Sequence, residues 1–356
     1  MAIENDIKAI QNCITNRLDN AAIGDRRFAG VIGSGPSHYS KSPALWNAAF
    51  GYLGINAIYL PFDVDGSHLR QLVFAFRHCD RFMGVNVTVP HKLSIMEFLD
   101  ELDPGVARIG AVNTVVRTPA GRLIGSNTDG EGFVESVLAP QPGTPHAFVD
   151  SLHGMDVLLL GAGGSARAVA FQVSDHLASG TLVISNRTLE HAVSLATAIR
   201  KTGGKVLAIG ESEVSGWAAK VGLIINATIK GQGGTPMESY SALAPANPAA
   251  TVASEHGNTV TNFHTDIERN NALSIELATT VPKTVRFYDL VYFPEETVFL
   301  RHARLTGHPT MNGKSMIVNQ AVIAFCKRIC RADLQARGID DPETCRRILE
   351  IMYDSW

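Results

Sequence analysis

The stretch VLLLGAGGSARA, residues 157–168, decides the fold of the central part of this chain. Its first four residues predict a buried strand, a glycine-rich turn follows, and the apolar residues after the turn recur at helical spacing. Gly161 permits a sharp turn, Gly163 lets the backbone approach a pyrophosphate, and Ala166 packs the helix against the strand. Such a strand–turn–helix unit directs the positive end of the helix at a phosphate.

The residues after this helix favour a dinucleotide site and select its cofactor. A second strand, TLVIS (181–185), follows at the expected interval, and a plain strand–turn–helix unit is the alternative interpretation. The strand leads into Asn186, Arg187 and Thr188. A guanidinium can bind a 2′-phosphate through two hydrogen bonds, so Arg187 favours NADP, while the nearby Glu190 leaves NAD possible. A solvated arginine at a strand end is the alternative.

The composition of the 356-residue chain is that of a globular protein, with 45% hydrophobic and 18% charged residues. A formal net charge of −3 and no run of Lys or Arg argue against nucleic acid and anionic membranes as partners. No apolar run approaches the ~20 residues that a membrane span needs. The five cysteines lack metal-ligand spacing, so we expect reduced thiols, a cytoplasmic location and no metal site.

The rest of the chain shows α/β organisation with two less regular segments. The N-terminal third alternates strand-like and helix-like runs, which favours a parallel sheet, and it opens on an amphipathic helix from Ile7 to Leu18. A Pro/Gly-rich connection covers 139–154, and a Gly-, Pro- and Ser-rich insert covers about 232–286. A helix that begins at Pro294 and ends near Gly307 is expected next, followed by C-terminal helices.

The segment MGVNVTVPHK, residues 83–92, places polar groups beside a predicted core strand. Its valines at 85, 87 and 89 alternate with Asn86 and Thr88, which indicates a strand with the valines buried on one face. Asn86 and Thr88 then lie on the other face, and Lys92 follows the strand end. A lysine of this kind, taken alone, is most often a solvated surface charge.

Three further polar stretches supply candidate site residues. Asn113 belongs to AVNT, Asp129 to GSNTDGEGF, and Ser40 and Ser42 to SHYSKSPALWN. Each has a structural alternative, because Ser-Pro often starts a helix and Asn-Thr-Asp-Gly often forms a turn. Their joint occurrence ahead of a nucleotide-binding fold favours a substrate site.

Together these motifs resemble the shikimate dehydrogenase family over nearly the whole chain. The landmarks occur in order: SKSP with Asn47, GVNVTVPHK, GAVNT, SNTDG, GAGGSARA, NRT, NAT, YDLVYFPEET and NGKSMIVNQA. The strand that ends in PHK and the NTDG turn are particularly specific.

The resemblance implies an oxidoreductase that interconverts 3-dehydroshikimate and shikimate with NADP(H), in aromatic amino acid biosynthesis. By similarity, Lys92 and Asp129 are the catalytic pair. Substrate contacts would come from Ser40, Ser42, Thr88, Asn113 and Gln320, with Tyr292 near the cleft. The dinucleotide would be held by Gly161, Ala162, Gly163, Gly164, Ser165, Asn186, Arg187 and Thr188, with Gly313 near the nicotinamide.

The residue types suit that chemistry independently of the resemblance. A cyclohexene carboxylate with hydroxyl groups needs short donors and acceptors of fixed direction, which serine, threonine and asparagine provide. Reduction of a ketone builds negative charge on its oxygen. An ammonium beside that oxygen stabilises the charge and delivers a proton. Asp129 would orient Lys92 for this role.

Some features leave alternatives open. The family's second basic residue after NRT is replaced by His191, and Lys314 follows Asn-Gly where the family commonly has an apolar residue. A quinate/shikimate or aminoshikimate dehydrogenase that uses NAD would share Lys92 and Asp129, although Ser42 favours shikimate. A non-catalytic, ligand-sensing relative is a further alternative, which the retained lysine and aspartate oppose.

We therefore expect two α/β domains with the active cleft between them. Residues 1–130 and 313–356 would form the substrate-binding domain, and residues 131–312 a Rossmann-type domain that carries the insert. Two connections between the domains suggest hinge closure. We expect a monomer or homodimer.

Overall fold

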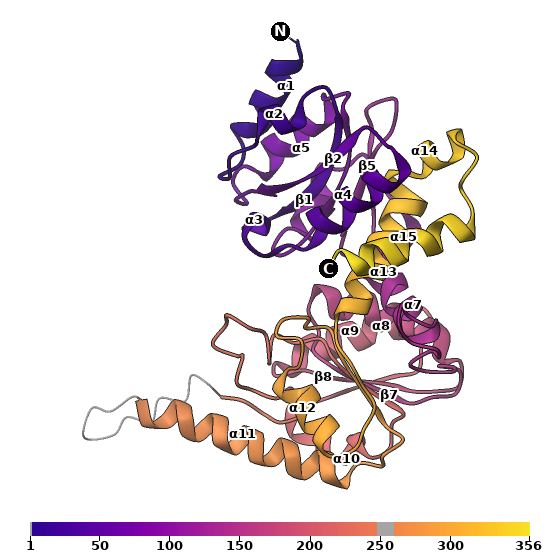
Figure 1. Ribbon diagram of the computed structural model, residues 1–356. Helices are drawn as coiled ribbons and strands as arrows, with labels where there is room; N and C mark the ends of the chain where they lie inside the picture. The colour runs from indigo at the N-terminus through magenta and orange to yellow at the C-terminus, as the bar shows by residue number, and fades with distance from the viewer. Residues whose placement is uncertain (1, 248–259) are drawn as a thin grey trace. The chain divides into compact units, whose positions relative to one another are not determined.

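The computed structural model describes residues 2–247 and 260–356, which divide into two compact units (Figure 1). Unit 1 comprises Met1–Glu135, Gln141–Pro145 and Ile317–Trp356, and unit 2 comprises Ser136–Pro140 and His146–Met316. The domain boundaries expected from the sequence, after residues 130 and 312, lie before the corresponding unit boundaries after Glu135 and Met316. Each unit combines one six-stranded sheet with helices, which confirms the predicted α/β class.

Unit 1 contains a sheet with the strand order β2-β1-β3-β5-β6-β4. β1 pairs in parallel with β2 and β3, whereas β5 is antiparallel to β3 and β6. The prediction of a parallel sheet is therefore wrong for β5, because the short turn between β5 and β6 permits only antiparallel pairing. The strands are β1 (Arg27–Gly33), β2 (Ala57–Asp63), β3 (Phe82–Val87), β4 (Glu101–Leu102), β5 (Thr114–Arg117) and β6 (Leu123–Ser126).

Alternate residues of β1 point into two separate cores. Phe28 and Ile32 pack with α1 and α5 on one face, whereas Ala29 and Val31 pack with α4 and the C-terminal helices on the other. Both faces of the central strands are therefore buried. The helices of this unit are α1 (Ala2–Gln11), α2 (Asn20–Ile23), α3 (Pro36–Tyr39), α4 (Ser42–Leu53), α5 (Leu69–Arg77), η1 (Ser94–Phe98), α6 (Pro104–Ile109), the π-helical turn η3 (Phe325–Ile329), α14 (Arg331–Ala336) and α15 (Pro342–Asp354). It also contains the start of α7 (Asp129–Leu138), up to Glu135, and the part of α13 (Lys314–Ala324) from Ile317 onward.

Unit 2 contains an all-parallel sheet with the order β12-β11-β10-β7-β8-β9. Counted along the chain from the far edge, this order is 3-2-1-4-5-6, the doubly wound arrangement of dinucleotide-binding domains. Its strands are β7 (Val157–Leu160), β8 (Leu182–Ser185), β9 (Val206–Ile209), β10 (Leu223–Asn226), β11 (Arg286–Asp289) and β12 (Thr310–Met311). Its helices are α8 (Gly164–Leu177), α9 (Leu189–Arg200), η2 (Glu211–Glu213), α10 (Val214–Ala218), α11 (Val260–Thr280) and α12 (Val298–Leu305).

The insert that the sequence left unassigned contributes a long helix to unit 2. α11, drawn in orange in Figure 1, contacts α12. Residues 248–259 of the insert lie outside the described residues. No helix among the described residues is long and apolar enough to cross a membrane.

Three predicted elements have different ends in the structure. β3 stops at Val87, and Val89 is 67% exposed, so only two of the three alternating valines are buried. The N-terminal helix stops at Gln11, although Ile14 and Leu18 are still buried beyond it. α12 starts after Thr297, whose hydroxyl accepts from the Leu300 amide, and not at Pro294. The Thr297 cap sets the start of α12, which apolar spacing does not specify.

Candidate functional site

Lys92 lies in the turn between β3 and η1, and its backbone is fixed on both sides. The preceding His91 is buried, and its Nε2 donates to the Val64 carbonyl at 2.8 Å. The Lys92 carbonyl accepts from the Val112 amide at 2.8 Å. The turn therefore presents the Lys92 side chain from a rigid position at the carboxyl end of β3.

Lys92 and Asp129 form a short ion pair. Asp129 is the first residue of α7, and its amide donates to the Asn127 side chain at 3.0 Å. The Lys92 Nζ lies 2.5 Å from Asp129 Oδ2, and the side chains are 12% and 6% exposed. Because water screens such a buried pair poorly, the carboxylate holds the ammonium in place more firmly than a surface partner would.

The second oxygen of Asp129 is held by Asn113, which precedes β5. Asn113 Nδ2 donates to Asp129 Oδ1 at 2.7 Å, and Asn113 Oδ1 accepts from the Thr128 amide at 2.7 Å. Asn113 Nδ2 also lies 3.4 Å from Gln320 Oε1, on α13. The structure therefore brings together four of the predicted site residues: Lys92, Asn113, Asp129 and Gln320.

A buried polar chain connects this pair to the serine pair. Asn86, on β3, donates to Thr114 Oγ1 at 3.0 Å, and Thr114 Oγ1 donates to Asn113 Oδ1 at 2.9 Å. Tyr59, on β2, donates to Asn86 Oδ1 at 2.7 Å. Burial raises the pKa of Tyr59 well above its usual range, while a hydrogen bond with the Ser42 side chain opposes that shift. The phenol thus stays protonated between Ser42 and Asn86.

Ser40 and Thr88 are predicted site residues of unit 1 that lie close in sequence to Ser42 and Asn86. Ser40 follows α3, and its Oγ accepts from the Ser42 amide at 3.3 Å, so it helps to start α4. Thr88 directly follows β3, and its side chain forms a hydrogen bond with the Tyr39 hydroxyl. Asp63 accepts from the Ser37 amide at 2.9 Å, which fixes the short helix α3 ahead of Ser40.

The glycine turn of unit 2 fits a pyrophosphate. Gly161 has φ +113°, and a Cβ there would lie 2.8 Å from the Ala227 carbonyl oxygen, so only glycine permits this approach. A Cβ on Gly163 or Gly164 would meet no atom of the described residues within 4 Å. The backbone at the start of α8 is therefore open, with its amide dipole directed outward, as phosphate binding requires.

The switch point of the sheet lies between β7 and β10, where Gly161 and Ala227 meet. In open doubly wound sheets, dinucleotides bind at this position. Close by, at the end of β8, the Ser185 hydroxyl is buried and has no hydrogen-bond partner among the described residues. An unpaired buried hydroxyl at this edge supports a polar ligand there. These residues fit the dinucleotide that the sequence predicted.

The other predicted dinucleotide residues line the same strand end or a separate loop. Arg187 is exposed, and Asn186 Nδ2 donates to the Thr188 carbonyl at 2.8 Å. Thr188 occupies the N-cap position of α9 without a capping hydrogen bond from its side chain. Ala162 and Ser165 belong to the glycine turn and the first turn of α8. In the separate loop, Gly313 donates its amide to the Val291 carbonyl at 3.1 Å, next to Tyr292.

Sequence reasoning missed Tyr59, Thr114 and Thr128 as parts of the site. Tyr59 lies in AIYLPFDV, which reads as an ordinary core strand, so only the structure shows its hydroxyl against Asn86. Thr114 and Thr128 adjoin Asn113 and Asp129 within the quoted motifs. Their position in those motifs was the signal that could have identified them.

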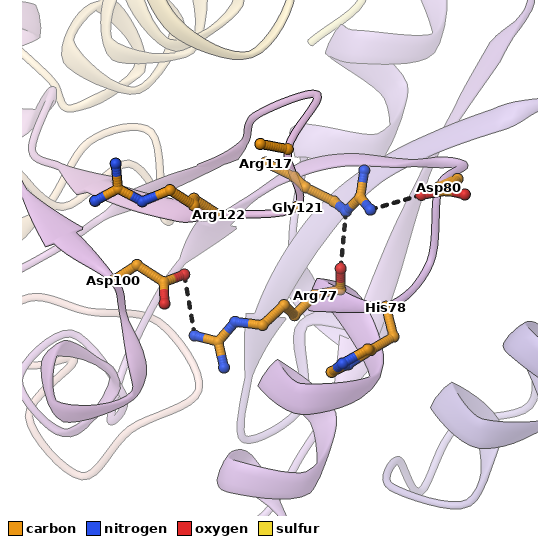
Figure 2. Close-up of a pocket in the computed structure, with 8 residues that line it drawn as sticks. Arg77, His78, Asp80, Asp100, Arg117, Gly121 and Arg122 are labelled. Carbon is orange, nitrogen blue, oxygen red and sulfur yellow. Dashed lines mark hydrogen bonds and ion pairs between the residues drawn. The ribbon is translucent and has the colours of Figure 1, made fainter.

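One hollow on unit 1 is lined by none of the predicted residues. Figure 2 shows it beside the end of α5, with Arg77 and Arg117 directed at aspartates. Arg77 pairs with Asp100 at 3.1 Å and Arg117 with Asp80 at 2.7 Å. Because these cations have carboxylate partners, the hollow offers no concentrated charge for a ligand.

Comparison with known proteins identifies the protein family to which these motifs belong. Residues 31–115 match the family model described as the shikimate dehydrogenase substrate binding domain. A protein of Desulforamulus reducens, named shikimate dehydrogenase (NADP(+)), is 36% identical over 307 residues, which cover 85% of this chain and 89% of that relative.

Solved structures agree over both units. Shikimate 5-dehydrogenase from Thermus thermophilus, in complex with NADP(H) and shikimate, has a TM-score of 0.64 and 30% identity, covering 90% of this chain and 99% of that one. Quinate dehydrogenase from Corynebacterium glutamicum, in complex with NAD, has a TM-score of 0.66 and 25% identity, covering 92% and 99%.

The fold and these relatives define an oxidoreductase that acts on a CH–OH group. The chain belongs to the shikimate dehydrogenase family. The family, fold class and enzyme class predicted from the motifs are thereby confirmed.

Proposed function

We propose that this protein reversibly reduces 3-dehydroshikimate to shikimate with NADP(H), and that Lys92 and Asp129 are its catalytic pair. The observation that carries the proposal is the 2.5 Å contact between Lys92 Nζ and Asp129 Oδ2. Curated relatives with 30–36% identity, named as NADP(+) enzymes, support the substrate and the cofactor.

The residues of unit 1 account for the chemistry at the substrate. When bound, NADPH supplies the hydride that adds to the ketone carbon. The Lys92 ammonium stabilises the negative charge that develops on the carbonyl oxygen, and it donates the proton that completes the hydroxyl. Asp129 keeps the ammonium in place, and Asn113 keeps the carboxylate in place. Shikimate oxidation reverses each transfer.

The serine hydroxyls suit the substrate carboxylate. Ser40 and Ser42 are neutral donors on the loop and first turn of α4, so no permanent charge must be buried to receive it. Thr88 and Gln320 offer donor and acceptor atoms for ring hydroxyls. Lys92, Asp129 and these groups belong to unit 1, while the dinucleotide residues belong to unit 2. A common cleft stays a prediction that a crystal structure with both ligands would test.

The test is a set of four steady-state assays, with shikimate or quinate as substrate and NADP⁺ or NAD⁺ as cofactor. We expect the highest kcat/KM with shikimate and NADP⁺. Dominant turnover of quinate with NAD⁺, as the name of the Corynebacterium relative describes, would overturn both the substrate and the cofactor assignment. Absence of turnover with every pair would favour a ligand-sensing protein.

We also propose a cytoplasmic location and a monomeric or homodimeric state. Among the described residues no cysteine takes part in a disulfide bond, and three of the five cysteines are buried, as expected of thiols kept reduced in a reducing compartment. Light scattering coupled to size-exclusion chromatography measures the oligomeric state directly. A tetramer would contradict this proposal, as would a secreted form in cell fractionation.

A further inference from the structure

Lys230 is a buried cation in unit 2 for which the proposed reaction has no use. It follows the NAT motif after β10, and its side chain is 7% exposed. Its Nζ lies 2.7 Å from Glu211 Oε1 and donates to the Ala244 carbonyl at 2.9 Å. A charge this deeply buried is costly unless its partners are fixed, so the arrangement ties the Lys230 loop to η2 and to the insert.

The insert is anchored at the same point. Asn270, a buried residue of α11, donates through Nδ2 to the carbonyls of Ser241, Ala244 and Pro245 at 2.9 to 3.1 Å. Its Oδ1 accepts from the Ser241 amide at 2.8 Å. α11 therefore holds residues 241–245 in one conformation, and the Ala244 carbonyl accepts from both Asn270 and Lys230.

This anchored segment borders the dinucleotide residues. Ala242, Leu243 and Ala244 line one enclosed hollow together with Gly161, Ser185, Glu211 and Thr228. Gly161 belongs to the phosphate turn, and Ser185 carries the buried hydroxyl without a partner among the described residues. The insert thus forms a wall beside the strand ends where the adenosine half of a dinucleotide binds in this fold.

Glu211 stands where it can oppose a 2′-phosphate. Ser185, the last residue of β8, pairs in register with Ile209, the last residue of β9. Arg187 and Glu211 each follow two residues later, at the carboxyl ends of these neighbouring strands. Arg187 is close enough to Lys230 to contribute to lowering the Lys230 pKa, after burial, which is the main cause. Arg187, Lys230 and Glu211 are therefore close enough to influence one another, and Asp266 adds a second negative charge near Lys230.

We propose that Lys230 is a specificity-determining residue of the dinucleotide site: it neutralises Glu211, so that Arg187 can receive the 2′-phosphate of NADP, and the insert keeps Lys230 in that position. This inference rests on the proposed NADP site and assigns a role to the insert. Without Lys230, the Glu211 carboxylate repels a 2′-phosphate and can accept hydrogen bonds from the ribose hydroxyls of NAD.

The test measures equilibrium binding of NADP⁺ and NAD⁺ by isothermal titration calorimetry at neutral pH. We expect Lys230→Met to raise the Kd of NADP⁺ about tenfold and that of NAD⁺ less than about threefold, as one nearby charge would do. In the double variant Lys230→Met/Glu211→Gln, the ratio of the two constants should return to within about threefold of the wild-type ratio.

Asn270→Ala tests the role of the insert, since it loosens residues 241–245, which hold Lys230, without changing a charge. It should move the ratio of the two constants in the same direction as Lys230→Met, by a smaller factor. An unchanged ratio would contradict the role given to the insert. The proposal is overturned if Lys230→Met weakens the binding of NADP⁺ and NAD⁺ equally, or weakens neither. It is also overturned if the double variant has the same ratio of the two Kd values as Lys230→Met.

If Lys230→Met does not fold, Glu211→Gln decides the question alone. The inference requires this variant to prefer NADP⁺ at least as strongly as the wild type, and a shift towards NAD⁺ overturns it. A wild-type protein that binds neither dinucleotide refutes the proposed function itself, which is a different result from an unchanged ratio.

Discussion

The ammonium of Lys92 lies 2.5 Å from the carboxylate of Asp129, although 37 positions separate the two residues. One group comes from a turn after β3 and the other from the first residue of α7. Asn113 completes the arrangement by donating to the free side of the carboxylate. The pair is therefore held by the sheet that carries all three segments.

Lys92→Ala should lower kcat by roughly 10²–10⁴-fold, the range typical of a lost proton donor, with a smaller effect on KM. Steady-state shikimate oxidation measures both constants. Lys283→Ala, which removes an exposed lysine of unit 2, serves as the control and should retain wild-type kcat. Near-normal kcat in Lys92→Ala would mean that Lys92 takes no part in proton transfer.

Asp129→Asn should lower kcat by roughly 10- to 10³-fold, because the amide can no longer pair with the Lys92 ammonium. The variant keeps an oxygen that can accept from Asn113. Glu131→Gln, two residues further along the same helix, is the matched control, since Glu131 pairs with Arg328 at 3.2 Å. Equal activity of the two variants would remove Asp129 from the catalytic pair.

Tyr59→Phe should lower the free energy of unfolding by about 1–2 kcal/mol, because the side-chain oxygen Oδ1 of Asn86 loses its buried donor. The KM for shikimate should rise more than kcat falls, since Ser42 loses a neighbour and Lys92 does not. Urea unfolding and kinetics measure the two effects. Tyr52→Phe, at an exposed tyrosine of α4, should change neither. An unchanged KM in Tyr59→Phe would contradict the link to Ser42.

Arg187→Gln should raise the Kd of NADP⁺ by roughly 10- to 100-fold, the loss expected when a bidentate contact to a charged phosphate is removed. The affinity for NAD⁺ should change little. Lys201→Gln, at the exposed end of α9, controls for a general loss of positive charge. If Arg187→Gln still prefers NADP⁺ as the wild type does, the 2′-phosphate is bound elsewhere.

Asp289 should make unfolding depend on pH. Burial raises its pKa to about 7, against 3.8 for an ordinary aspartate, although hydrogen bonds from Thr297, Val291 and Asn226 oppose the shift. Between these values the folded protein holds a proton that the unfolded chain releases. The stabilisation is therefore complete below about pH 4, declines by at most ~1.4 kcal/mol per pH unit, and is lost above about pH 7.

Comparison with Asp289→Asn isolates this contribution. The free energy of unfolding of the wild type, minus that of the variant, should fall between about pH 4 and pH 7 and stay constant at higher pH. Urea unfolding of both proteins across this range measures the difference. A difference that does not change with pH would show that Asp289 titrates normally.

The sequence alone determined the elements whose residues are neighbours along the chain. VLLLGAGGSARA needs only a buried strand, Gly161 and a helix start, and the structure has all three. The strand periodicity also located Val85 and Val87 in one core and Asn86 on the opposite face. The end of that strand was missed, because the exposure of Val89 depends on what the rest of the chain leaves uncovered.

Tertiary structure decided which polar groups meet. Tyr59, Asn86, Thr114 and Asn113 come from three strands or their ends, and no local pattern states that their side chains form one hydrogen-bonded chain. The contact of Lys230 with Glu211 and Ala244 is likewise invisible in the composition of the insert. Periodicity reports whether a residue is buried, but the partner of a buried polar group depends on strand order and register, which distant segments set together.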